Sequence, residues 1–177
     1  MASPNDTVEM ALMGMDTSII APLIVLAARS WPGWRRLVIP AALTLPLFLL
    51  AHAAITVWMV QAMPGPGSDL GFQAGLIVVS VWFWLPVFGP ARRLSDAGRT
   101  AYLFLAMPTM DLAGVYVIVR GDAAGGLAMI VAMLPIGLLA VALTWHWILT
   151  EAAAETAVTG VATDDLFTYP HRLRADR

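Results

Sequence analysis

Four ionisable side chains lie within long apolar stretches of this 177-residue chain, where water cannot solvate a charge. They are Asp16, His52, Asp111 and His146, and the neutral polar residue Gln73 lies in a similar setting. Ionisable groups inside a membrane are costly, so they usually face the interior of a helix bundle and mark functional sites. A carboxylate near the middle of a membrane must be protonated, paired or bound to a cation, which makes Asp111 the strongest candidate.

Each of these side chains also has a structural interpretation. His52 is the most plausible partner of Asp111, because a rise of about 1.5 Å per residue places both near the membrane centre. An interhelical hydrogen bond between them and a metal or proton role are the two alternatives. His146 lies between two tryptophans, so we expect it to anchor its helix at the interface rather than to bind a ligand. For Asp16, capping or hydration of a helix near the outer surface is the alternative to a functional role.

Methionine provides a second kind of candidate ligand, because thioether sulfur is a soft donor that suits Cu(I). Three pairs of methionines are three or four residues apart, so the members of each pair share a helix face. The pairs are Met10 with Met13, Met59 with Met63, and Met129 with Met133, all in the outer half of the membrane by the topology below, unlike Met107 and Met110. The alternative is that these side chains are flexible apolar filler.

The composition identifies the medium in which these groups act. Hydrophobic residues make up 59% of the chain and charged residues 12%, against about 25% charged residues in soluble domains. Such a chain cannot cover a water-facing surface, which excludes an ordinary soluble enzyme, a disordered protein and a nucleic-acid-binding protein. Cysteine is absent, which excludes disulfides, thiolate metal sites and cysteine nucleophiles. The sequence contains no phosphate-binding glycine loop, nucleophile triad or zinc motif, so we do not expect an enzyme.

Five segments are long and apolar enough to cross a bilayer, which takes about 20 residues. They cover residues 10–28, 37–63, 70–90, 100–119 and 125–150. The sequence therefore predicts an all-α, polytopic membrane helix bundle over 1–150 and a mobile cytoplasmic tail over 151–177, whose start could continue the fifth helix. The leader before the first segment carries no cation, so we expect an uncleaved helix rather than a signal peptide.

The positions of the arginines predict the orientation. All ten cations are arginines, and nine of them lie in the first loop, the third loop and the tail, leaving Arg120 alone in the fourth loop. Under the positive-inside rule this places the N-terminus outside and the C-terminus in the cytoplasm. Tryptophans favour the membrane interface, and six are expected toward the inner side: Trp31, Trp34, Trp82, Trp84, Trp145 and Trp147.

Several short motifs follow one another between Trp82 and Glu155. They are Trp84-Leu-Pro-Val-Phe-Gly-Pro90, Arg92-Arg-Leu with Tyr102 shortly after, Phe104-Leu-Ala-Met-Pro-Thr-Met-Asp-Leu-Ala-Gly114 and Gly125-Gly-Leu-Ala-Met129, with a weaker echo in Ile20-Ala-Pro-Leu-Ile-Val-Leu26. Together they resemble the caa3-type cytochrome c oxidase assembly factor family. Its members are bacterial inner-membrane proteins linked to copper delivery into haem-copper oxidases.

The resemblance implies site residues as well as a function. Asp111 matches the family pattern, and His52 matches its tryptophan-histidine position, although Ala51 precedes it here. Two histidines of the family are replaced, by Met13 in the first span and by Gln73 in the third. Family members are also longer, so the chain is similar to a reduced and divergent member in which Met13 takes the place of a histidine ligand.

We therefore expect a multi-pass factor of the bacterial inner membrane that acts in cytochrome c oxidase biogenesis and binds or delivers Cu(I) on the outer side. The expected metal ligands are Met13, His52, Met59, Met63 and Asp111. The alternative is a non-catalytic accessory subunit, surrounded by membrane lipid, that packs against haem-copper oxidase subunits or another respiratory complex. Small residues such as Gly114, Gly125 and Gly126 would allow such close helix contacts.

Two further functions are less well supported by the sequence. A carrier or proton-linked channel with Asp111 as the titrating group lacks the internal repeat that is typical of transporters. A transmembrane cytochrome of the b type needs two histidines at similar depth, whereas His52 is expected near the membrane centre and His146 near the cytoplasmic end of its span.

Overall fold

The computed structural model describes residues 4–37, 39–62, 66–91 and 93–168, and every regular element in these ranges is a helix. The first membrane span is made of α1 (Pro4–Met15), a π-helical turn η1 (Asp16–Ile20) and α2 (Ala21–Ala27), which follow one another without a break. A short 3-10 turn η2 (Pro32–Arg36) leads to the other helices, which are α3 (Ala41–Ala62), α4 (Pro66–Phe88), α5 (Asp96–Val119) and α6 (Ala123–Thr168).

The described residues contain five helical stretches that are long and apolar enough to cross a membrane, as the sequence predicts. These stretches are Thr7–Ala27, Ala41–Gln61, Gly71–Phe88, Asp96–Val119 and Ala123–Thr156. A helix pairs its own backbone N–H and C=O groups, which a lipid environment requires of any spanning segment. The predicted all-α, polytopic architecture is confirmed, and the chain has the build of a multi-pass membrane protein.

Local interactions explain why two of the helices, α3 and α5, begin at residues that differ from the predicted ones. α3 begins at Ala41 rather than at 37, because Pro32–Arg36 form a 3-10 turn and Pro40 directly precedes the helix. α5 begins at Asp96 rather than at 100, because the Ser95 side chain accepts a hydrogen bond from the Gly98 N–H at 3.1 Å. This is the usual N-terminal cap of a helix, and it extends the helix beyond the apolar segment.

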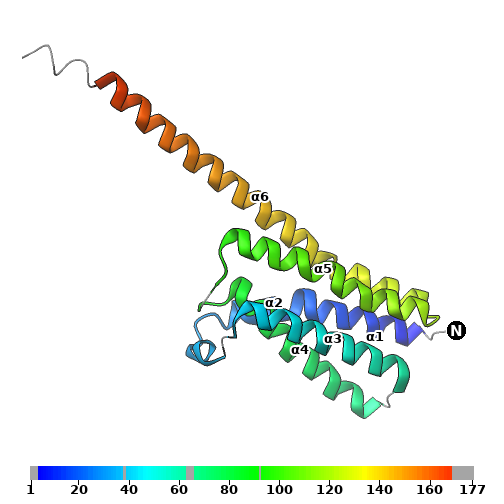
Figure 1. Ribbon diagram of the computed structural model, residues 1–177. Helices are drawn as coiled ribbons and strands as arrows, with labels where there is room; N and C mark the ends of the chain where they lie inside the picture. The colour runs from blue at the N-terminus through cyan, green and yellow to red at the C-terminus, as the bar shows by residue number, and fades with distance from the viewer. Residues whose placement is uncertain (1–3, 38, 63–65, 92, 169–177) are drawn as a thin grey trace, which may run out of the picture.

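The fifth apolar segment ends at residue 150, and α6 continues from there to Thr168 without interruption, so the start of the predicted tail continues this helix, as the sequence allowed. The residues after 150 are rich in alanine and glutamate, which are strong helix formers. At about 1.5 Å per residue, a helix of 46 residues is about 70 Å long, more than twice the thickness of a hydrocarbon core. Figure 1 shows α6 running well past the end of the bundle.

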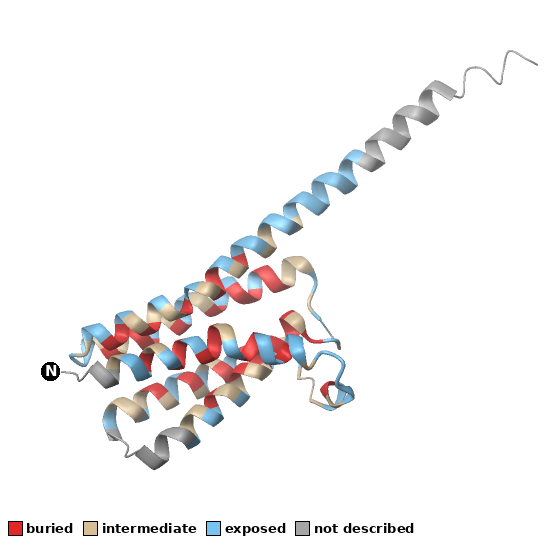
Figure 2. Ribbon diagram, turned by 180° about the vertical axis from the view of Figure 1, so that it is seen from behind, coloured by how far each residue is buried: buried red, intermediate tan, exposed pale blue. Residues whose placement is uncertain are grey.

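The helices pack around a core that no single one of them could cover. α6 packs along α5, with which it forms a hairpin, and along α1 (Figure 1). α2 packs against α4, and α3 contacts both α4 and α5. In Figure 2 the buried residues lie on the mutually facing sides of the helices and the exposed residues lie on the outer sides. Those outer sides carry large apolar side chains such as Leu50, Leu105 and Leu138, as expected for contact with lipid.

Glycines allow two helix pairs to approach closely. A Cβ atom on Gly126 of α6 would lie 2.5 Å from the carbonyl oxygen of Gly114 on α5. A Cβ atom on Gly14 of α1 would lie 2.6 Å from Cβ of Ala132 on α6. Small residues at such positions let helix backbones touch within a membrane. Gly125 has a different role, because its neighbour is the Asp122 side chain, which accepts a hydrogen bond from the Gly125 N–H.

Trp84 of α4 is a core residue and not the interface anchor that the sequence predicted. Its ring is fully buried, lies edge-on to Phe83 and stacks on Phe88. The indole N–H donates to the Thr17 carbonyl oxygen at 2.7 Å, which satisfies the one polar atom of the side chain. By contrast, Trp31 and Trp145 are exposed, as an anchoring role requires.

Candidate functional site

A pocket opens between three helices at the end of the bundle that contains the start of α1, and we call it the α1–α3–α4 pocket. Its volume is about 80 Å³. Its lining residues come from α1, α3 and α4: Glu9, Leu12, Met13, Met59, Phe72, Gln73 and Leu76. Segments that are about 50 residues apart in the sequence meet here, which gives the pocket donors of several chemical types.

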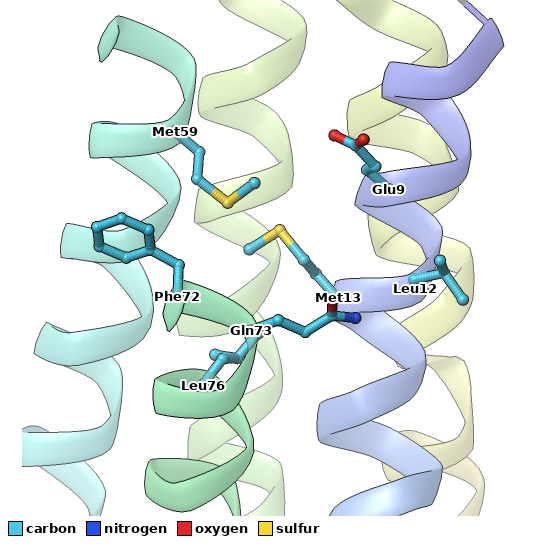
Figure 3. A pocket seen from close by; sticks show the side chains of 7 residues that line it. All are labelled: Glu9, Leu12, Met13, Met59, Phe72, Gln73 and Leu76. Carbon is cyan, nitrogen blue, oxygen red and sulfur yellow. The ribbon is translucent and has the colours of Figure 1, made fainter. Parts of the chain in front are cut away.

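Two of the predicted soft ligands lie together in this pocket. In Figure 3 the side chains of Met13 and Met59 point toward each other across the space between α1 and α3. Met13 is almost completely buried and Met59 is half-buried. The Glu9 carboxylate projects toward the same space from one turn earlier in α1 (Figure 3). Met63, the other predicted ligand on this helix face, lies outside the described residues.

A hydrogen bond fixes the polar side chain on the α4 wall of the pocket. The Gln73 amide nitrogen donates to Oδ2 of Asp16 at 2.8 Å, which joins α4 to the π-helical turn. Asp16 is buried, so its carboxylate has this partner within the protein rather than the surface role that the sequence left open. The amide is therefore held in place beside the two thioethers.

The π-helical turn carries a polar cluster that sequence reasoning missed apart from Asp16. Thr17 Oγ1 lies 3.1 Å from Ser80 Oγ on α4, and the Ser18 hydroxyl donates to the Ala132 carbonyl oxygen at 2.6 Å. Together with the Trp84 bond, these contacts tie the first span to α4 and α6. Isolated π-turns within helices are frequent at functional sites. Three consecutive polar residues, Asp-Thr-Ser, inside an otherwise apolar span were the available signal.

His52 lies in the core of the bundle and does not line the α1–α3–α4 pocket. Its ring stacks on Phe48 with centroids 5.7 Å apart, and only 1% of its surface is exposed. Within the described part of the chain, neither ring nitrogen makes a hydrogen bond. Of the two alternatives for this pair, the interhelical hydrogen bond between His52 and Asp111 is therefore wrong. The two side chains do not meet because of the way their helices are rotated about their own axes: Asp111 faces α6, whereas His52 stacks on Phe48.

Asp111 lines a second, smaller space, which we call the α5–α6 cavity. Its volume is about 30 Å³. Its lining residues come from α5 and α6: Met107, Met110, Asp111, Ile130, Met133, Leu134 and Ile136. The structure thus separates the four predicted ligands that it describes, placing Met13 and Met59 in one pocket, Asp111 in another and His52 in neither.

The remaining candidates from the sequence are structural or exposed. Met10 and Met129 are buried in the core and line neither pocket, which fits the role of apolar filler. His146 is exposed on α6, as expected for a residue at an interface.

The donor chemistry limits which ion the α1–α3–α4 pocket can hold. In the part of the chain that the structure describes, no three histidine, aspartate or glutamate side chains are grouped to hold a metal ion. The pocket instead offers two thioethers with a carboxylate and an amide. Thioethers select Cu(I) over the harder divalent ions, which prefer oxygen or imidazole donors.

Comparisons with known proteins do not place the chain in a family. No protein-family model matches it, and neither a curated protein nor a solved structure matches it.

Proposed function

We propose that this chain is a bacterial inner-membrane factor for haem-copper oxidase biogenesis that binds Cu(I) in the α1–α3–α4 pocket. The observation that carries the proposal is the meeting of Met13 and Met59 in one pocket from two distant segments. The resemblance of residues 82–155 to the caa3-type oxidase assembly factors supplies the biological context. The proposed ligand set differs from the one expected from sequence, since His52 and Asp111 do not line this pocket.

Each lining residue has a role in the proposed site. The sulfur atoms of Met13 and Met59 bind Cu(I), and the Glu9 carboxylate balances its positive charge. Gln73, held by Asp16, keeps the α4 wall fixed. The stacked rings of Trp58 and Phe72, with centroids 3.9 Å apart, close the space between α3 and α4.

Transfer in this proposal is an exchange of ligands without a change of oxidation state. A pocket of about 80 Å³ has room for several water-sized groups, since about 10–15 Å³ is enough for one. There is consequently room for the ion and for one donor group of a partner protein. That donor forms a bond to Cu(I) as the bond between Cu(I) and one methionine sulfur breaks, so copper stays Cu(I) throughout and no electron is needed.

Replacing both thioethers tests the proposal. Met13→Leu combined with Met59→Leu keeps the side-chain volume and removes both sulfurs. We expect the affinity for Cu(I) at this pocket to fall by more than about tenfold, since even outer-shell changes at metal sites cost about 10- to 100-fold. The measurement is competition with a colorimetric Cu(I) chelator on reduced, purified protein, and the same variant should lower oxidase activity in cells grown at limiting copper.

Met15→Leu is the matched control, because Met15 is on the same helix but is exposed on another face. It should leave both the affinity and the oxidase activity unchanged. Wild-type affinity in the double variant would refute the proposed site.

An accessory subunit of a respiratory complex remains the second candidate function. The observation that favours it is the exposed apolar surface of α6 in the part of the helix that includes Trp145, Ile148 and Leu149. The experiment above separates the two functions. Added copper should restore oxidase activity in cells with the Met13 and Met59 variant if the chain handles copper, whereas the loss of a structural subunit would not respond to copper.

The proposed orientation can be tested by cysteine labelling, because the sequence contains no other cysteine that would react. Ser30, in the first loop, and Ala123, at the start of α6, are both exposed. Each can be replaced singly by cysteine. A membrane-impermeant maleimide applied to intact spheroplasts should label Ala123→Cys and leave Ser30→Cys unlabelled until the cells are lysed. The opposite pattern would place the α1–α3–α4 pocket on the cytoplasmic side and exclude delivery on the outer side.

A further inference from the structure

The α5–α6 cavity gathers four donor side chains that the proposed function does not use. Met107, Met110 and Asp111 follow one another on α5 with spacings that place them on neighbouring parts of one helix surface, and Met133 reaches the cavity from α6. Met110 and Met133 are almost completely buried, whereas Met107 and Asp111 are half-buried. The cavity is therefore lined by three thioethers and one carboxylate.

The packing of α5 on α6 builds this arrangement. A Cβ atom on Gly137 of α6 would lie 2.9 Å from the sulfur of Met107, so the glycine leaves the space in which the thioether lies. One turn or more away, Gly114 and Gly126 bring the two backbones together. Both glycine contacts hold the helices at the distance at which Met107 and Met133 can line a common cavity.

The Asp111 carboxylate needs a proton or a cation to neutralise it at this place. Among the described residues, no hydrogen bond or ion pair of Asp111 is found, although it lies in the membrane-spanning part of α5. A lone carboxylate at this depth is costly unless a proton or a bound cation neutralises it. One monovalent cation beside Asp111 leaves the pair with no net charge.

Size and donor type decide which cation fits. A cavity of about 30 Å³ has room for about two water-sized groups, since about 10–15 Å³ is enough for one, so it admits an ion but no larger organic ligand. Hard cations such as Ca²⁺ take six or more oxygen donors, whereas this cavity offers one carboxylate. Three soft sulfurs select Cu(I).

We infer that the α5–α6 cavity is a second Cu(I) site, formed by the thioethers of Met107, Met110 and Met133 with the Asp111 carboxylate as the neutralising ligand. The inference goes beyond the proposed function, because it uses different helices and a different set of residues. The full chain then binds two copper ions, one in each space.

The test is Cu(I) titration of the purified full chain in detergent against a colorimetric chelator. Wild type should bind two ions, and Met13→Leu with Met59→Leu should bind one. Asp111→Asn should lower the affinity for the ion in the α5–α6 cavity by more than about tenfold, on the scale of changes around metal sites. Met110→Leu with Met133→Leu should abolish binding of that ion. Leucine and asparagine are close in volume to the residues they replace, so these variants should fold.

Met129→Leu is the matched control, because Met129 is a buried methionine of α6 that lines neither space. It should leave both ions in place. Copper-edge X-ray absorption of the Met13 and Met59 variant should show sulfur neighbours around the one remaining ion.

The outcomes separate the two proposals. A single ion that disappears in the Met13 and Met59 variant would overturn the second site and leave the proposed function standing. A single ion that disappears only in the Met110 and Met133 variant would overturn the site of the proposed function and leave the α5–α6 site standing. Unchanged stoichiometry in the Met110 and Met133 variant, or an Asp111→Asn protein that binds as tightly as wild type, would refute the α5–α6 site.

Discussion

Trp84→Ala is expected to lower the free energy of unfolding by about 3–5 kcal/mol, the usual cost of removing a buried tryptophan from a packed core. The indole has no exposed surface, and it contacts Phe83 and Phe88 as well as the first span. Its loss leaves a cavity in the interior and also removes the donor to the Thr17 carbonyl oxygen. Equilibrium unfolding in mixed detergent and dodecyl sulfate micelles measures the change.

Two companion variants separate the contributions. Trp145→Ala removes a tryptophan that is 64% exposed, and it should change stability by less than about 0.5 kcal/mol, as surface substitutions usually do. Trp84→Phe keeps an aromatic ring and leaves the Thr17 carbonyl without its donor, which should cost about 1–3 kcal/mol. If Trp84→Ala were as mild as Trp145→Ala, α4 would not pack against the π-helical turn as described.

Gly126→Ala is the second substitution with a large expected effect. The new Cβ atom would meet the Gly114 carbonyl oxygen at 2.5 Å and the Ile118 backbone nitrogen at 3.0 Å. These are backbone atoms, so relief requires α5 and α6 to move apart, and overpacking of this kind costs about 1–3 kcal/mol. The same unfolding assay should show the loss.

Gly75→Ala is the matched control, because nothing lies within 4 Å of the Cβ that it adds to α4. In a helix this change favours folding by up to about 1 kcal/mol, since glycine is the poorer helix former. The two variants should therefore shift stability in opposite directions. Equal shifts would show that α5 and α6 do not meet at Gly114 and Gly126.

The number and approximate positions of the helices were predictable because a bilayer imposes a length and an apolar composition on each span. The helix bounds differ from the bounds of the apolar segments where local chemistry extends a helix past its segment. The Ser95 cap lengthens α5 at its start, and the alanine-rich sequence after residue 150 lengthens α6. Neither effect changes hydropathy, so a search for apolar segments does not detect it.

The pairing of side chains was much less predictable. A helix that is apolar on all sides gives no sign of which side faces the core and which faces lipid. Depth along the membrane axis can be estimated from the sequence, and it placed Met13 and Met59 correctly at the same end of the bundle. Rotation about the helix axis cannot be estimated in that way, and it separates His52, among aromatic rings, from Asp111, which faces α6.

The contact between Trp84 and the π-helical turn could not be predicted from the sequence either. A tryptophan near a predicted span end fits an interface anchor by position alone, yet its N–H donates to the Thr17 carbonyl oxygen within the protein. That contact depends on the first span lying beside α4, which no local pattern reveals.

The most direct measurement of the central claim is the copper content of the reduced, purified full chain after exposure to Cu(I) and removal of unbound metal. Binding through Met13 and Met59 predicts at least one tightly held ion per chain with sulfur neighbours, reduced when both residues are replaced by leucine and unaffected by Met15→Leu. A wild-type chain that retains no Cu(I), or retains it equally in the Met13 and Met59 variant, would contradict the account.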